Sequence, residues 1–140
     1  MPDYITHDQF VRRFPVLVLD QRTLPRRREA IITLLVGAMV EIDIGRRYTE
    51  AGINAKLEAW VDTFGGSMGL DHVAIRRMLV DEGYLHRNLS GTTYVLRARS
   101  PRFGYEWSIR SLDLSGLVEE FEQQRAERRD AYASHADERL

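Results

Sequence analysis

The apolar residues of this chain change their spacing once between residues 26 and 97, and this change constrains the fold more than any other feature. They recur at helical spacing through residues 26–42, 50–64 and 72–82. Two short strand-like runs follow within residues 84–97, separated by the turn pair Ser90-Gly91. Three helices followed by a two-stranded wing form the winged-helix arrangement. The pattern therefore predicts a mainly α domain of winged helix-turn-helix type with a small β-hairpin.

Capping and turn residues mark the boundaries of these elements. Pro25 stands at the entry to the first helix, where proline is tolerated, and Gly45 follows its end. Thr49 and Asp71 are the N-cap candidates of the second and third helices, and Gly83 is the natural residue after the third. We expect the apolar faces of these elements to form one core from Leu35, Met39, Leu57, Trp60, Ile75, Leu79, Leu85 and Tyr94.

The same boundaries divide the chain into three parts. Residues 1–23 form an N-terminal extension with a short helix, and residues 24–99 form the winged-helix-like domain. Residues 100–140 form a linker and a C-terminal helix with a polar tail. This last helix is expected to begin at Asp113 or Ser115 and to be solvated near its end, where it becomes polar all round.

In the N-terminal extension, a proline interrupts the apolar pattern. Asp8–Phe14 predict a short helix with Thr6 as its N-cap, and Pro15 is expected to end it. The apolar run Val16–Leu19 that follows is interpreted as a strand or a packed segment.

Three further segments are predicted to be extended or irregular. Arg46–Tyr48 read as an extended link between the first two helices of the domain, and Gly65–Gly69 read as a flexible turn. Tyr105, Trp107 and Ile109 alternate with polar residues, which indicates a short strand or an extended packed segment.

Charge is distributed unevenly along the chain. The formal net charge is −1, but residues 1–110 carry 16 basic against 13 acidic residues, whereas residues 111–140 carry 4 against 8. Only Lys56 among the 20 basic residues is a lysine. The body is therefore mildly basic and the tail acidic, and arginine is the side chain that suits bidentate contacts with phosphate and guanine.

Several classes of function lack the residues they need. The chain has no cysteine, so disulfides, thiolate metal sites and cysteine catalysis are excluded. The four histidines are scattered without metal-type spacing, and the glycines at 65, 66 and 69 lack the context of a phosphate loop. No signal peptide or membrane-length apolar run is visible. We expect a non-enzymatic cytoplasmic protein without a cofactor, a metal or a membrane partner.

Candidate DNA contacts lie on three of the predicted elements. We expect Arg76 on the third helix to contact bases and Arg87 on the wing to contact phosphate, both from solvent-exposed positions on one face. The basic start of the first helix opposes the helix dipole, which favours a use in phosphate binding. The full set comprises His72, Arg76 and Arg77 on the third helix, Arg87, Asn88 and Arg97 on the wing, and Arg26 and Arg27 on the first helix.

Structural roles compete with these assignments. Arg77 is spaced for an ion pair with Asp81, and Asp71 is a second possible partner of these helix arginines. The wing and the first-helix arginines also fit solvated surfaces. Thr49 is better explained as a cap than as part of a polar site, and Asn54 is expected to turn inward and bond a loop backbone.

Four sequence pieces, in order, resemble the bacterial family catalogued as domain of unknown function 2087. This family is found alone or fused behind a regulator-type helix-turn-helix domain. The resemblance implies a winged-helix-like fold and a link to transcription regulation, and it brings no catalytic residues. Ala51 and Ile53 depart from the family pattern, which has an acidic residue and a valine there. The matching pieces are Leu24-Pro25, Tyr48-Thr49-Glu50 with Asn54, Ile75–Asp81 with Gly83-Tyr84-Leu85, and Arg87, Gly91 and Tyr94.

Two functions from different classes follow. The first is a DNA-binding transcriptional regulator on double-stranded DNA, with a second copy of the chain as a partner because paired half-sites require two copies. The second is a winged-helix module that docks on a protein partner without binding DNA. An unbroken positive surface of Arg76, Arg77, Arg87 and Arg97 favours the first. Interruption by Asp81 and Glu82 favours the second.

Overall fold

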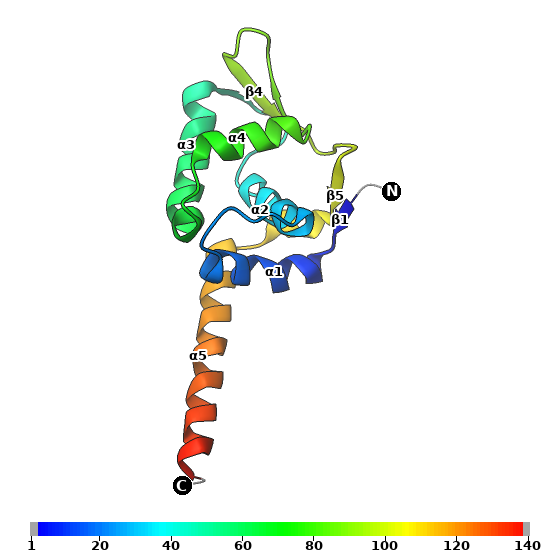
Figure 1. The fold of residues 1–140 in the computed structure, drawn as a ribbon. Coiled ribbons are helices and arrows are strands. Elements are labelled where there is room, and N and C mark those ends of the chain that lie inside the picture. The colour runs from blue at the N-terminus through cyan, green and yellow to red at the C-terminus, as the bar shows by residue number, and fades with distance from the viewer. Residues whose placement is uncertain (1–2, 139–140) are drawn as a thin grey trace.

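The computed structural model describes residues 3–138 and is mainly helical, with a small antiparallel sheet and a long C-terminal helix (Figure 1). The body contains four α-helices, and the fifth, α5, leaves it as a single rod. The helices are α1 (His7–Asp20), α2 (Arg28–Met39), α3 (Glu50–Trp60), α4 (His72–Asp81) and α5 (Leu114–Glu138).

Two small sheets connect the helices. The three-stranded antiparallel sheet has the order β2-β4-β3, so β4 lies in its centre. In the second sheet, β1 and β5 pair in parallel. This pairing joins the N-terminal strand to the segment that precedes α5. The strands are β1 (Asp3–Ile5), β2 (Arg47–Thr49), β3 (Leu85–Arg87), β4 (Thr93–Leu96) and β5 (Phe103–Tyr105).

The predicted helices, hairpin and core of the central part are confirmed. All eight residues expected in the core are buried. Thr49 Oγ1 accepts a hydrogen bond from the Gly52 amide at 3.0 Å, and an Asp71 carboxylate oxygen accepts one from the Val73 amide at 2.6 Å. These are the two expected N-caps. Gly83 adopts a positive φ of 78° after α4, as a residue that ends a helix commonly does.

The prediction that Pro15 ends the first helix is wrong. Thr6 caps α1 as expected, but the helix continues through Pro15 to Asp20, so Val16–Leu19 are helical. The buried residues Phe10, Phe14, Leu17 and Val18 form one apolar stripe on both sides of the proline. Proline in a helix interior removes a backbone hydrogen bond and destabilises the helix by about 3 kcal/mol. Burial of this stripe offsets that destabilisation.

Three loop predictions also need correction. Arg47–Thr49 form a strand, β2, that pairs with β4 rather than a link. The segment predicted as a flexible turn, Gly65–Gly69, is mostly helical. A π-helical turn at Val61–Gly65 is followed by a 3₁₀ turn at Gly66–Met68. Gly69 then reverses the chain with a φ of 64°. Only the first part of the expected strand around Tyr105 is extended, because Trp107–Ser111 form a 3₁₀ helix.

Candidate nucleic-acid interface

Helix α4 presents a narrow solvent face. Ile75 and Leu79 are fully buried against the core, and they fix the rotation of the helix about its axis. Arg77 lies on the opposite side and is exposed, as is Asp81 one turn later. Within residues 3–134, no carboxylate lies within ion-pair distance of Arg77, so the expected pair with Asp81 does not form.

Arg76 points towards α3 instead of into solvent. Its guanidinium donates to Asn54 Oδ1 at 2.6 Å and lies 3.5 Å from a Glu50 carboxylate oxygen. It also lies over the Tyr94 ring, 5.6 Å from the centroid, and only 16% of the side chain is exposed. The prediction that Arg76 is solvent-exposed is therefore wrong. The prediction that Asn54 bonds a loop backbone is wrong as well, because among the described residues its side chain bonds only Arg76.

His72 lies in the same space between α3 and α4. Its Nε2 is 3.3 Å from Glu58 Oε1, and its Nδ1 is 3.7 Å from Asp71 Oδ1. The contact with Glu58 crosses from α4 to α3, whereas Asp71 is the N-cap of α4 itself. His72 therefore lies against α3, as Arg76 does.

The tip of the β3–β4 hairpin is closed by Asn88. Its side-chain oxygen accepts from the amides of Thr92 at 2.8 Å and Thr93 at 3.1 Å, and its amide group donates to Thr92 Oγ1 at 2.9 Å. The exposed Arg87 side chain lies directly over Gly91, whose φ of 73° suits glycine. Asn88 thus shapes the hairpin, and Arg87 lies across its tip.

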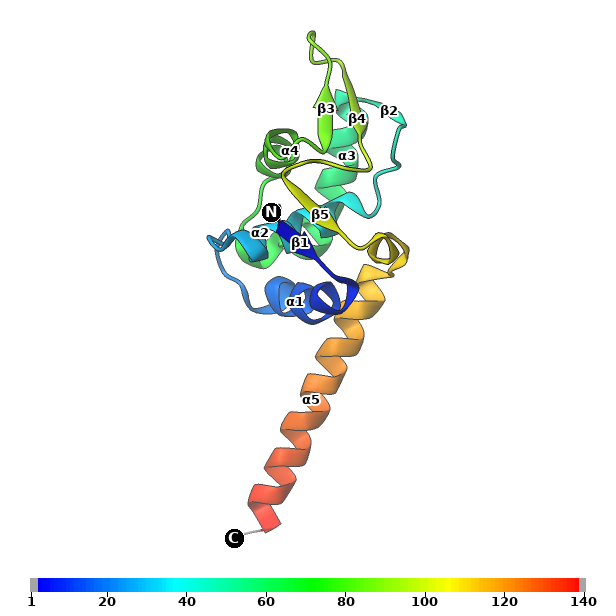
Figure 2. The same cartoon turned by 90° about the vertical axis from the view of Figure 1, so that its right-hand side faces the viewer.

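The outer face of the three-stranded sheet carries a basic hollow of about 550 Å³. Arg47 of β2 and His86 of β3 both stand opposite Val95 of β4, and Arg97 follows on the same face two residues later. Figure 2 shows the three strands side by side at the end of the molecule away from α5. The described residues that line the hollow include no acid: Arg47, His86, Arg87, Asn88, Thr93, Val95 and Arg97.

Arg47 is a member of this basic hollow that sequence reasoning missed. The predicted extended link at Arg46–Tyr48 assigns no face to the Arg47 side chain. An alternation signal exists, because Tyr48 is buried between exposed Arg47 and Thr49. Three residues are too few for such a signal to stand out before the strand's partner is known.

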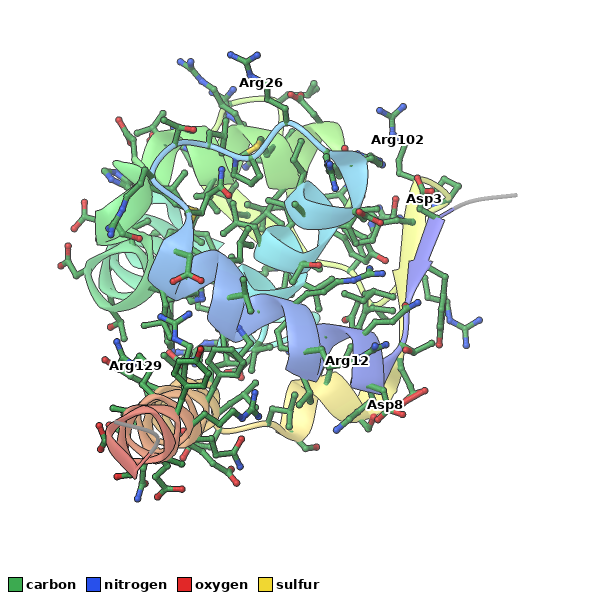
Figure 3. The ribbon with its side chains drawn as sticks, turned by 60° about the horizontal axis from the view of Figure 1, so that its bottom comes forward. Asp3, Asp8, Arg12, Arg26, Arg102 and Arg129 are labelled. Atoms are coloured by element: carbon green, nitrogen blue, oxygen red, sulfur yellow. The ribbon has the colours of Figure 1, made fainter. Side chains whose placement is uncertain are left out.

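The arginines at the start of α2 do not join the hollow. Arg28 makes a two-armed ion pair with the buried Glu82 and also lies 3.3 Å from Asp3. Arg26 and Arg27 are exposed, and Figure 3 shows Arg26 pointing away from the body. Glu82 therefore does not interrupt a positive surface, because its carboxylate is turned inward.

Hydrogen bonds from Arg28 hold the pKa of the Glu82 carboxyl below its ordinary value, although burial opposes this shift. Arg102 contributes from the other side, with its Nε 3.5 Å from Glu82 Oε2. A carboxylate between two guanidinium groups stays ionised. This cluster joins β1, α2 and the loop before β5, so its role is to hold the body together.

The small helical domain with a three-stranded antiparallel sheet falls within a known bacterial family. Residues 22–96, just over half of the chain, match the family model described as "Uncharacterized protein conserved in bacteria (DUF2087)". The chain belongs to this family. Comparisons with curated proteins and with solved structures find no match. Within the described residues, no helix is both long enough and apolar enough to cross a membrane.

Proposed function

We propose that this chain is a DNA-binding transcriptional regulator of winged-helix type, without catalytic activity. The order α2, β2, α3, α4, β3, β4 supports this proposal, because a winged helix places its strands and helices in that sequence. The antiparallel hairpin β3–β4 stands where the wing would be, and α4 takes the place of the recognition helix.

The basic hollow on the sheet is the observation that carries the proposal. Arg47, Arg87 and Arg97 lie around it, and within residues 3–134 none of them has a carboxylate at ion-pair distance. Arginines that line one hollow without counter-charges fit a strand of phosphates. On α4, Arg77 takes over the base-contacting role first expected of Arg76.

Binding to duplex DNA should weaken steeply as salt is added. Each phosphate neutralised by an arginine contributes a slope of about −0.9 to log K against log salt, so three arginines predict about −2.7. Affinity should then fall roughly 40-fold between about 50 and 200 mM salt. Fluorescence anisotropy of labelled genomic duplexes measures both the affinity and the slope.

Arg97→Gln should reduce this slope by about one and weaken all sequences alike, because a phosphate contact carries no sequence information. Arg12→Gln is the matched control, since the exposed Arg12 lies on α1 at the end of the body opposite the wing (Figure 3). Equal effects of the two variants would contradict a phosphate-binding wing.

A protein-docking module is the second candidate, and the face of α4 favours it. Arg77 is offset by the exposed Asp81, and the partly buried Val73 and Val80 lie along one flank of that arginine, one turn before and one turn after it. Such a neutral, partly apolar helix face suits a protein surface better than a DNA groove. If no duplex is retained at micromolar protein and low salt, the docking module replaces the regulator.

A further inference from the structure

Among the residues that the structure describes, the distal half of α5 contacts no other element. Arg125 makes the last contact with the body, through two hydrogen bonds to the Asp20 carboxylate at 2.8 and 3.0 Å. Residues 126–138 continue the helix for about 20 Å beyond that point, and Figure 1 shows this segment pointing away from every other element. An isolated helix of this length is marginal in water. Tyr132 within it is 79% exposed.

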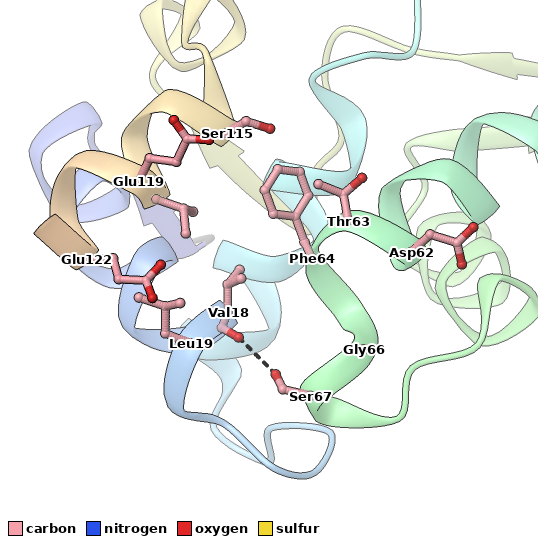
Figure 4. A pocket seen from close by; sticks show the side chains of 11 residues that line it. Val18, Leu19, Asp62, Thr63, Phe64, Gly66, Ser67, Ser115, Glu119 and Glu122 are labelled. Atoms are coloured by element: carbon pink, nitrogen blue, oxygen red, sulfur yellow. Dashed lines mark hydrogen bonds between the residues drawn. The ribbon is translucent and has the colours of Figure 1, made fainter.

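A hollow of about 430 Å³ lies beside the base of the same helix. Its floor is partly apolar, with Val18, Phe64 and Val118 among its lining residues. Asp62, Glu119 and Glu122 also line it, and Figure 4 shows the two glutamates of α5 across from Phe64. The described lining contains no basic residue, so the hollow suits an occupant that carries arginine and an aromatic ring.

The distal half of α5 carries these groups. Arg129 and Tyr132 lie three residues apart and therefore share a helix face, next to Arg128. Because the helix is continuous, this segment leads away from its own hollow and cannot fold back into it. A second copy of the chain can supply the segment if the two α5 helices run antiparallel.

Spacing along α5 supports this arrangement. Val118, Glu122, Arg129 and Tyr132 follow one another at intervals of four, seven and three residues, which places them along one seam. Arg125 lies in the middle of this seam and stays bonded to Asp20 of its own chain. In an antiparallel pair centred near Ala126, Glu122 of each copy stands opposite the partner's Arg129. The Glu122–Arg129 contact then occurs twice, once at each end of the pair, by symmetry.

We propose that the protein forms a dimer through antiparallel pairing of two α5 helices, with the partner's Arg129 and Tyr132 seated against the hollow beside Val118 and Glu122. Reciprocal ion pairs between Glu122 and Arg129 select this register. The distal half of α5 is thereby covered in the dimer.

Sedimentation of the full-length protein without DNA tests the pairing. Arg129→Glu should raise the dissociation constant at least about tenfold, because it places like charges opposite each other. The double variant Glu122→Arg with Arg129→Glu restores opposite charges and should restore the dimer. Glu127→Arg lies on the far side of the helix and should change nothing.

The absence of cysteine offers a second test of the geometry. Ala126→Cys introduces a single thiol near the two-fold axis, so mild oxidation should give a disulfide-linked dimer, whereas Glu127→Cys should not. Three results overturn the proposal: a wild-type monomer at the highest soluble concentration, a dimer indifferent to Arg129→Glu, or a charge-swapped double variant that stays monomeric. DNA binding is not part of these measurements, so the proposed function can fail without affecting them.

Discussion

Replacing Phe14 with alanine should lower the free energy of unfolding by about 3–5 kcal/mol, the range for buried phenylalanine. The Phe14 ring is fully buried and stacks on Phe10 at 5.0 Å between centroids. It also meets the edge of Phe64 at 5.4 Å and lies 6.4 Å from Trp60. Phe14 therefore fixes α1, which precedes the family-matched segment, onto α3 and the turn that follows it.

Chemical denaturation followed by tryptophan fluorescence measures this loss. Val16→Ala is the matched control, because Val16 lies on the same helix with 42% of its surface exposed. Its effect should stay within about 0.5 kcal/mol. A Phe14→Ala variant as stable as this control would contradict the described core.

The close approach of Phe14 to Gly37 allows a second test of the same packing. A methyl group on Gly37 would lie 2.5 Å from Phe14 Cε1, so Gly37→Ala should destabilise the wild-type protein. In the Phe14→Ala background the methyl group has room. The two substitutions should therefore be coupled by about 0.5–3 kcal/mol in a double-mutant cycle.

Replacing Arg28 with methionine should lower the free energy of unfolding by about 3 kcal/mol at neutral pH. This is the lower end of the range for breaking a buried ion pair. The Glu82 side chain is only 10% exposed and would keep Arg102 as its remaining basic neighbour. Because 40% of the Arg28 side chain is exposed, solvent screening limits the loss. Arg46→Met is the control, since the exposed Arg46–Asp43 pair should contribute no more than about 1 kcal/mol.

The Arg28 prediction includes a pH dependence. The pKa of Glu82 is lower in the folded protein than in the unfolded chain, so the unfolded chain takes up the proton first as the pH falls. The stabilising contribution is complete above the ordinary glutamate pKa and is lost as the pH falls through the lowered value. The difference in stability between wild type and Arg28→Met should therefore shrink on acidification. A difference that stays constant or grows would contradict the Arg28–Glu82 pairing.

Local sequence pattern predicted the central helices, the hairpin and the N-caps, because each depends on residues only three or four positions apart. Strand β1 was not predicted, and β2 was predicted only as an extended link, for the opposite reason. Each has three residues and exists because of a distant partner: β1 pairs with β5, and β2 pairs with β4. At Pro15, a local rule was overridden by tertiary burial on both sides of the proline.

The candidate site was predicted in part. Arg87 and Arg97 of the β3–β4 hairpin line one hollow, as predicted for neighbouring positions, but the orientation of the α4 arginines was missed. With 100° between successive residues, the buried pair Ile75 and Leu79 directs Arg77 to the opposite side of the helix and Arg76 towards one flank. Helix geometry could therefore have separated the two arginines. The acceptors that hold Arg76 could not be foreseen, because they come from α3.

The parallel pair β1–β5 also has a kinetic consequence. Asp3 pairs with Phe103, so these two short strands close a loop of 100 residues, which in a flexible chain costs about 4 kcal/mol of entropy plus a constant. So few backbone hydrogen bonds cannot offset that cost alone, so the pair must form after the helices have brought its ends together. We expect it to be the last native contact made and the first to open. Amide hydrogen exchange at Ile5 and Tyr105 should then be faster than at Ile53 or Leu79, and equal protection would contradict this order.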